Sequence, residues 1–270
     1  IIMNNNLVFS FWVEGELDFH STICIKSWLK LGYDVTIFKY EDINTDNNKF
    51  PSVVFKDARQ FCERPPFNKP QEIADYFRFA KLLKTGGTWL DSDELLLKRL
   101  PEDEVIISSE HCKRFGAYSP KNREKTPNIG VLRFPPNHPI IAETMKRFKR
   151  QIKRGGIPEN VNQNYNHLMK KFQAIILKEG RQLVSEPELY CPISWAYAKE
   201  LYEKPDLWET KKFGSDPHKK FGIDQKQLQI ILDKSYGIHL WRNLYHTRGY
   251  VDRPVNGSVF DKLCKMILDN

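Results

Sequence analysis

The chain has 270 residues, 40% hydrophobic and 28% charged, a composition typical of a globular protein with a sizeable core. Its apolar runs are too short to cross a bilayer, and its five scattered cysteines lack a Cys-x-x-Cys pair, which argues against a zinc knuckle and for reduced thiols. The net charge of +8 suits a phosphate-bearing ligand or a membrane surface, but a generic basic surface explains it as well.

The first forty residues predict a strand, a helix and a second strand. Residues 7–13 are apolar, and residues 34–40 are rich in β-branched and aromatic side chains, as strands are. Between them, residues 20–31 carry apolar side chains at helical spacing and end at Gly32. This order predicts a βαβ unit of an α/β domain.

The next segment begins with a polar stretch and ends in two acidic residues. Residues 41–70 contain four prolines, so we expect loops there with at most one short helix. Residues 71–85 have a helical apolar stripe, and the two glycines that follow occupy the place of a left-handed helix cap. Residues 88–90 then predict a short strand that ends at residues 91–93.

The remaining elements are shorter. We expect strands at 94–97, 105–109, 129–134 and 236–241, and helices at 138–153, 161–178, 195–202 and 258–268. Apart from its short helix, the segment 180–235 is rich in prolines and turn residues and predicts irregular structure. Without an internal repeat or a low-complexity linker, one domain with a helical elaboration is expected. The start of the chain lacks the pattern of a signal peptide.

Asp91 and Asp93 stand one residue apart, directly after the short strand. If both are extended, their carboxylates face the same side, and the carboxyl edge of an α/β sheet opens into a ligand crevice. Two carboxylates there suit a hard cation such as Mg²⁺ or Mn²⁺, which neutralises charge on a leaving diphosphate. The alternative is a solvated acidic turn, because the Asp-x-Asp pattern alone often arises by chance.

Asp75 and Arg78 lie three residues apart on the helix expected at 71–85, so they share one face. A helix packed beneath the sheet edge would aim both into the crevice, where they could bind sugar hydroxyls and phosphate. An ordinary surface salt bridge is the alternative.

The stretch ADYFRFAKLLKTGGTWLDSD resembles the core signature of the DXD-motif sugar transferases with a GT-A fold. Its pattern is an acid, two residues, an arginine, an aliphatic helix end, Gly-Gly, a hydrophobic pair and Asp-x-Asp. The residues that fit are Asp75, Arg78, Gly86, Gly87, Trp89, Leu90, Asp91 and Asp93. The group includes capsular polysaccharide sugar transferases, fungal initiating mannosyltransferases, glycolipid α-galactosyltransferases and clostridial glucosylating toxins. The segments FWVEG, SWLKLGYDVTIFKYEDI, NIGVLRFPPNHPII and IHLWRN are similar to further parts of the family pattern.

The resemblance implies an α/β fold of GT-A type, a Rossmann-like mixed sheet flanked by helices with a helical and loop elaboration in the C-terminal half. We therefore expect a single glycosyltransferase domain over residues 1–270. Its nucleotide-sugar-binding core would cover about 1–135, the acceptor-side elaboration about 136–235, and an active-site strand and helix about 236–270.

The resemblance also implies a set of site residues. Asp91, Asp93 and His239 would hold Mn²⁺ or Mg²⁺, and Asp75 and Arg78 would bind the donor sugar. Trp12, Asp91 and Trp241 would contact the nucleotide, and Asp91, Asp93 and Arg78 would be catalytic. Core packing is the alternative for Trp12, and a satisfied core histidine is the alternative for His239.

The implied activity is a metal-dependent, retaining hexosyltransferase that uses a UDP- or GDP-sugar and a glycan, lipid-linked or glycolipid acceptor, as in capsule or other polysaccharide biosynthesis. No nucleic acid is expected as a partner. The protein is expected to be cytoplasmic. The basic run 146–154 could contact an anionic membrane surface peripherally, and the alternative is that it forms the solvated face of a helix. The alternatives are a toxin-like protein-modifying glycosyltransferase, a metal-dependent nuclease and a non-catalytic nucleotide-sugar-binding module.

Overall fold

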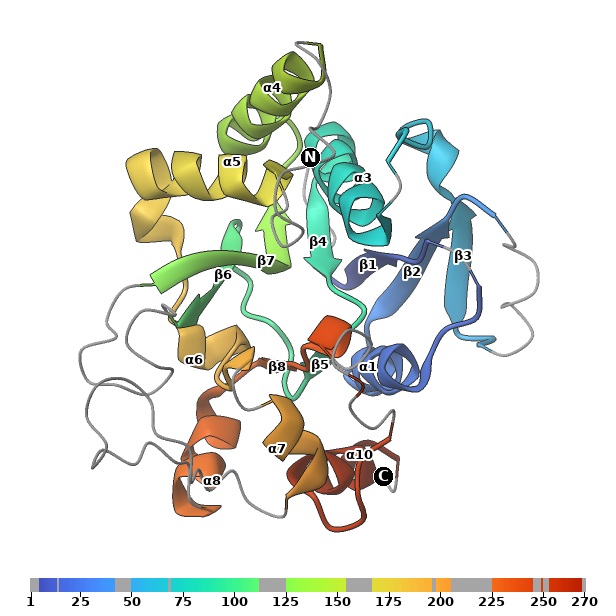
Figure 1. Cartoon of the computed structure of the whole chain (residues 1–270), viewed down its shortest axis with the longest axis vertical. Helices are drawn as coiled ribbons and strands as arrows, with labels where there is room; N and C mark the ends of the chain where they lie inside the picture. Colours follow the sequence, from blue (N-terminus) through green and yellow to red (C-terminus); the bar gives the residue numbers. More distant parts are fainter. Residues whose placement is uncertain are drawn as a thin grey trace.

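The computed structural model describes residues 5–13, 15–41, 50–67, 69–111, 125–153, 167–195, 198–204, 225–244, 249 and 253–268. Figure 1 shows a central sheet with helices on both sides. The strands are β1 Leu7–Phe11, β2 Asp34–Lys39, β3 Val53–Asp57, β4 Gly87–Leu90, β5 Glu94–Leu96, β6 Ile106–His111, β7 Lys125–Phe134 and β8 Gly237–His239. The α-helices are α1 Phe19–Lys30, α3 Pro70–Thr85, α4 Pro139–Lys153, α5 His167–Ile175, α6 Pro187–Tyr190, α7 Ala198–Glu203, α8 Gln225–Lys234 and α10 Val259–Leu268. Short 3-10 or π turns are η1 Ala58–Gln60, η3 Ile176–Gly180 and η4 Arg181–Leu183.

The large sheet has six strands in the order β3-β2-β1-β4-β7-β6. The first four run parallel, whereas β7 is antiparallel to both β4 and β6. This mixed sheet confirms the expected α/β class and the βαβ start of the chain. β5 and β8 form a separate antiparallel pair, which lies in the lower half of Figure 1.

Neighbouring residues of each central strand enter two different hydrophobic clusters, one on each face of the sheet. Val8 and Leu90 belong to the cluster covered by α1, α7 and α10, whereas Phe9 and Trp89 belong to the cluster covered by α3, α4 and α5. Figure 1 shows these two sets of helices below and above the sheet. Successive side chains of a strand point to opposite faces, and both faces are covered by helices. The central strands are therefore apolar at every position and not only at every second one.

Several predicted boundaries need correction. Residues 41–70 contain the edge strand β3, whose short sequence is flanked by polar residues and prolines and pairs on one side alone. The irregular segment 180–235 contains α6 and α8 as well as the expected short helix. The strand expected at 236–241 ends at His239, because Trp241 adopts a left-handed φ of 59°. The first residues of the helix expected at 161–178 lie outside the described part of the chain.

The connection from α3 to β4 aims the acidic pair at the sheet edge. Gly86 and Gly87 both have positive φ, 62° and 109°, which favours glycine. Gly86 combines this φ with a ψ of −158°, so the predicted left-handed helix cap is wrong in its ψ. A Cβ on Gly86 would also lie 2.6 Å from the carbonyl oxygen of Phe134. This close approach lets β4 leave the helix at once and pair with β7.

Candidate active site

Asp91 and Asp93 lie in a turn at the carboxyl end of β4. The Glu94 amide donates to the Asp91 carbonyl (2.9 Å), which closes the turn, and the Asp91 amide donates to the Gly130 carbonyl of β7 (2.7 Å). The expectation of an extended pair is therefore wrong, because the chain bends here to begin β5. The position itself is as expected: β1 lies between β2 and β4, and such a switch point opens a crevice at the carboxyl edge.

Asp91 is held from the side of α3. Its Oδ1 accepts hydrogen bonds from Arg78 Nη2 (2.6 Å) and Trp89 Nε1 (2.7 Å). The same Arg78 nitrogen lies 3.2 Å from Asp75 Oδ1, and the side chains of Asp75 and Arg78 are each 5% exposed. The Asp75–Arg78 pair is therefore buried at the sheet edge, and the alternative of a surface salt bridge is wrong.

Arg78 is fixed by more than its two carboxylates. Its guanidinium lies over the Trp89 ring, 4.4 Å from the centroid, and Nη1 donates to the Ile129 carbonyl (2.7 Å). Asp75 Oδ2, in contrast, is buried without a hydrogen-bond partner among the described residues. A buried carboxylate oxygen that lacks a donor costs free energy, so it indicates a position for a ligand hydroxyl.

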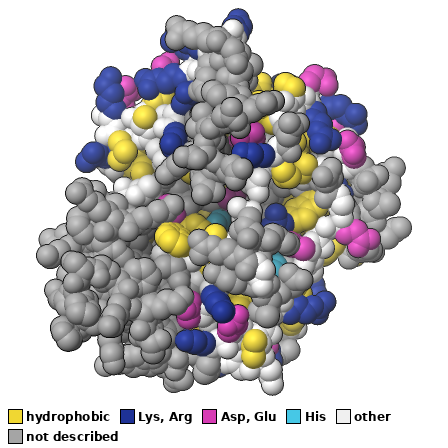
Figure 2. Space-filling model, in the orientation of Figure 1, with side chains coloured by type: hydrophobic (Ala, Val, Ile, Leu, Met, Phe, Trp, Pro, Cys, Tyr) yellow, Lys and Arg dark blue, Asp and Glu magenta, His cyan; other side chains and the backbone are white. Residues whose placement is uncertain are grey.

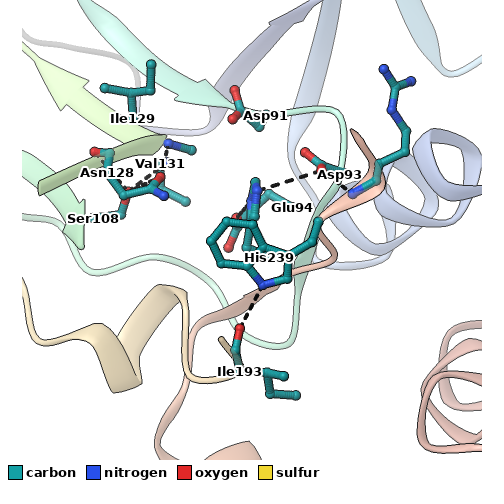
Figure 3. A network of polar contacts seen from close by, with 12 residues as sticks. Asp91, Asp93, Glu94, Ser108, Asn128, Ile129, Val131, Ile193 and His239 are labelled. Atoms are coloured by element: carbon teal, nitrogen blue, oxygen red, sulfur yellow. Dashed lines mark hydrogen bonds and ion pairs between the residues drawn. The ribbon is translucent and has the colours of Figure 1, made fainter. Parts of the chain in front are cut away.

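Asp93 is held from the opposite side, by the segment around β8. Its Oδ2 accepts from the Arg242 backbone amide (2.9 Å) and lies 3.7 Å from His239 Nε2, and its carbonyl accepts from the Leu240 amide (2.9 Å). The other ring nitrogen of His239, Nδ1, lies 3.1 Å from Glu94 Oε2. Figure 3 shows the His239 ring between Glu94 and Asp93, with Asp91 nearby.

Asp91, Asp93 and His239 each place one ligand atom within 4.8 Å of the others. Neighbouring ligands of one octahedral Mg²⁺ ion are about 3 Å apart and opposite ligands about 4.2 Å, so the three side chains would move closer together to share one ion. Because Asp91 Oδ1 already accepts two hydrogen bonds, Oδ2 remains for a cation. Two carboxylates and one imidazole fit a hard or borderline divalent ion such as Mg²⁺ or Mn²⁺.

The two aspartates differ in their electrostatics. Burial raises the pKa of Asp91 in spite of Arg78, whereas the pKa of Asp93 is lowered, because His239 and Arg242 outweigh its burial. Burial also opposes the charging of His239, but the carboxylates of Asp93 and Glu94 raise its pKa to about 10. Without a metal ion, a protonated His239 therefore supplies the positive charge between the carboxylates.

The structure places the two predicted tryptophans beside the site without assigning them a role. Trp12 follows β1 and is 9% exposed, and the Arg242 guanidinium lies 4.6 Å from its ring centroid. The Trp241 ring meets His239 edge-on, with centroids 4.5 Å apart, and its Nε1 donates to the Ile193 carbonyl (2.8 Å). Nucleotide binding by either ring stays a prediction.

Sequence reasoning missed two residues that shape the site. Glu94 is next to the acidic pair, but its partner His239 is 145 residues away. Arg242 acts through its backbone amide, which leaves no signal in the side-chain pattern. Lys98, which follows the acidic pair in the chain, donates to the Asp233 carbonyl.

Residues 19–112, about a third of the chain, match the family model described as a glycosyltransferase sugar-binding region containing a DXD motif. No curated protein matches the chain. Among solved structures, the PaToxG glycosyltransferase is 20% identical with a TM-score of 0.48, over 64% of this chain and 69% of that one. The bifunctional WbbM glycosyltransferase is 14% identical with a TM-score of 0.46, over 87% of this chain and 45% of that one. The glycosyltransferase GlyE of Streptococcus pneumoniae TIGR4 is 14% identical with a TM-score of 0.38, over 67% of this chain and 45% of that one.

The matched region contains α3, β4 and the Asp-x-Asp pair. Over these residues the chain is similar to the sugar-binding region of DXD-containing glycosyltransferases.

Proposed function

We propose that the chain transfers a hexose from a UDP- or GDP-sugar to a glycan, lipid-linked or glycolipid acceptor, in a metal-dependent reaction that retains the anomeric configuration. The observation that carries this proposal is the meeting of Asp91, Asp93 and His239 at the carboxyl edge of the sheet. The buried, unpartnered Asp75 Oδ2 supports a sugar hydroxyl beside them. The roles of these residues and a single catalytic domain over residues 1–270 are parts of the proposal.

Different side chains bind the donor sugar and stabilise the leaving diphosphate. Asp75 Oδ2 accepts a hydrogen bond from a hydroxyl of the donor sugar, and Arg78 adds a fixed positive charge close to the diphosphate. Asp91, Asp93 and His239 hold Mn²⁺ or Mg²⁺, which when bound neutralises charge on the leaving nucleoside diphosphate. Trp12 and Trp241 border the nucleotide.

The chemistry exchanges one bond at the anomeric carbon for another. The bond from this carbon to the phosphate oxygen breaks, and the acceptor hydroxyl oxygen bonds to the same face, which retains the configuration. The acceptor proton passes to the leaving phosphate. This route needs no nucleophilic side chain, so Arg78 and the ligand set serve to stabilise negative charge.

A thermal-shift screen tests the donor half of the proposal. UDP, GDP, CDP and their sugars are each added with Mn²⁺, with Mg²⁺ or with a chelator, because a ligand of the folded form raises the melting temperature. We expect one nucleotide to stabilise the protein only with metal, and its sugar to be slowly hydrolysed. Binding without sugar release from any donor would instead identify a non-catalytic module.

Asp93→Asn tests the site directly. We expect transfer to fall about 10³-fold or more, because metal-assisted charge stabilisation contributes several kcal/mol and each 1.4 kcal/mol is tenfold. Far-UV circular dichroism should stay unchanged. Asp34→Asn, at an exposed aspartate that bonds Asn6, is the matched control and should keep full activity. Metal-dependent turnover in Asp93→Asn at the wild-type rate would remove the site assignment.

The membrane side of the proposal involves α4. Its C-terminal half exposes Lys146, Lys149, Arg150 and Lys153, and Figure 2 shows Lys and Arg side chains gathered in the upper part of the face where Figure 1 places α4. None of the described helices is long and apolar enough to cross a bilayer. Peripheral contact with an anionic surface would appear as cosedimentation with phosphatidylglycerol vesicles that is lost when these four residues are changed to glutamine.

A further inference from the structure

Glu94 is a buried acidic residue to which the proposed transfer assigns no part. It is the first residue of β5, directly after the turn of the acidic pair, and it is 1% exposed. In the β5–β8 ladder it stands opposite His239, so the two form a cross-strand pair. The carboxylate and the imidazole therefore meet because of the strand register.

The contacts of the pair define which nitrogen faces the cation position. Glu94 Oε2 lies 3.1 Å from His239 Nδ1, within hydrogen-bond distance. Because a metal-binding histidine commonly donates its second N–H to a carboxylate, this contact suits Nδ1 as the donor. The opposite nitrogen, Nε2, points toward Asp93 at 3.7 Å, too far for a hydrogen bond between them. Nε2 is thus the nitrogen left for a metal ion.

Two glycines leave the space that the Glu94 carboxylate occupies, and α1 fixes its backbone. A Cβ on Gly237 would lie 2.7 Å from Glu94 Oε1, and a Cβ on Gly130 would lie 3.4 Å from Oε2 and 3.3 Å from His239 Nδ1. The Trp28 indole donates to the Glu94 carbonyl (2.8 Å), which ties β5 to α1. The slot around the pair therefore has little room for another orientation of either side chain.

We propose that Glu94 is a positioning residue that orients His239 and fixes its Nδ1–H form, so that Nε2 completes the divalent-cation site with Asp91 and Asp93. This inference rests on the proposed metal-dependent function. A metal-binding histidine commonly donates its second N–H to a carboxylate, and loss of that carboxylate costs about 10- to 100-fold in metal affinity.

Mn²⁺ binding, followed by electron paramagnetic resonance of free Mn²⁺ without nucleotide, tests the inference. Glu94→Leu removes the acceptor and should weaken Mn²⁺ binding about 100-fold, whereas Glu94→Gln keeps a neutral acceptor oxygen and should weaken it about 10-fold. Gly237→Ala displaces the carboxylate without removing it and should also weaken binding. Glu200→Gln, at a buried glutamate of α7, is the matched control and should bind as wild type.

A double-mutant comparison separates orientation of His239 from general damage to the fold. If Glu94 acts through His239, Glu94→Gln should weaken Mn²⁺ binding in wild type and leave it unchanged in His239→Ala. Nitrogen chemical shifts of His239 in the Mg²⁺-loaded protein should show a protonated Nδ1 and a metal-bound Nε2 in wild type.

These measurements distinguish failure of the proposed metal-dependent function from failure of the proposed role of Glu94. Wild-type protein that does not bind Mn²⁺ would overturn the proposed metal-dependent function, and this inference with it. Wild-type protein that binds Mn²⁺, with Glu94→Gln binding equally well or losing as much affinity in His239→Ala as in wild type, would overturn the role of Glu94 alone.

Discussion

Two aspartates separated by one residue are held by two different parts of the molecule. Asp91 is bound by Arg78 and Trp89, which are 13 and 2 residues away in the chain. Asp93 is bound by the Arg242 amide, 149 residues away, and lies beside His239. One half of the site is thus built within a single helix–strand unit, and the other half exists only when the C-terminal segment has docked on it.

The two halves have similar charges but different donors. On the side of α3, the two carboxylates of Asp75 and Asp91 share the single guanidinium of Arg78. On the side of β8, the two carboxylates of Asp93 and Glu94 share the imidazole of His239, and Asp93 also accepts from the Arg242 backbone amide. Each half therefore carries excess negative charge, which favours an added cation, and the distant half differs by its backbone donor.

Arg78→Met should produce the largest change, because it leaves the buried carboxylate of Asp75 and the partly buried carboxylate of Asp91 without their cation. Breaking a buried pair in this way costs about 3–5 kcal/mol in the free energy of unfolding, and sugar transfer should be lost as well. Urea unfolding at pH 7.5 and pH 5 measures the free energy of unfolding. The lower pH should restore part of the stability by protonating the carboxylates. Arg133→Met is the control, since Arg133 is buried with bonds to Thr88 and the Pro101 carbonyl, and its loss should not be relieved at pH 5. An equal response of both variants to pH would contradict the role of Arg78 as the cation that compensates Asp75 and Asp91.

Asp75→Asn tests the same half through pH. Burial raises the pKa of Asp75 to about 7, although Arg78 opposes the shift. A carboxyl whose pKa is higher in the folded state binds its proton more tightly there, so wild type loses stability as the pH rises from about 4 to about 7. Asp75→Asn should remove this loss and exceed wild type by about 4 kcal/mol in unfolding free energy at pH 8.

Wild type and Asp75→Asn should be nearly equal in stability at pH 4. Donor transfer by Asp75→Asn should fall most above about pH 7, where wild-type Asp75 is charged and its unpartnered oxygen can bind a sugar hydroxyl. Asp57→Asn is the control of opposite sign, since hydrogen bonding to Arg59 lowers the pKa of Asp57. If wild type and Asp75→Asn show the same pH dependence of unfolding, Asp75 is not the group that titrates.

The local half of the site could be predicted from sequence because its signals are contiguous. A helical stripe, two glycines, a short apolar strand and an acidic pair follow one another, and spacing alone puts Asp75 and Arg78 on one face. The acidic pair was expected to be extended, however, and nothing in the local pattern revealed the turn that starts β5.

The distant half depended on the family resemblance, which pointed to His239 and Trp241. Glu94 and Arg242 remained hidden, because their contacts depend on the β5–β8 register and on a backbone amide. The missed strand β3 has a similar cause: its pairing with β2 stabilises it more than its own short sequence does.

Gly86→Ala tests whether the local half depends on the backbone as well as on charge. The new Cβ would lie 2.6 Å from the Phe134 carbonyl oxygen, and the positive φ adds strain. We expect a loss of about 2–3 kcal/mol in unfolding free energy. Gly15→Ala is the matched control, because Gly15 also has a positive φ (74°) but no atom within 4 Å of the added Cβ, so it should lose about 1 kcal/mol. Equal losses in both variants would show that φ, and not the close approach to β7, sets the requirement for glycine.

Arg242→Ala should have the smallest effect, because the bond to Asp93 comes from the backbone amide, which alanine retains. The variant loses a partly exposed ion pair with Asp18 (3.0 Å) and the contact with the Trp12 ring. Together these are expected to contribute no more than about 1 kcal/mol to stability. Mn²⁺ affinity should stay within about twofold of wild type, whereas His239→Ala, which removes a proposed ligand from the same half, should weaken it strongly. If Arg242→Ala weakened Mn²⁺ binding as much as His239→Ala, the side chain and not the amide would hold Asp93, and the distant half would depend on charge as the local half does.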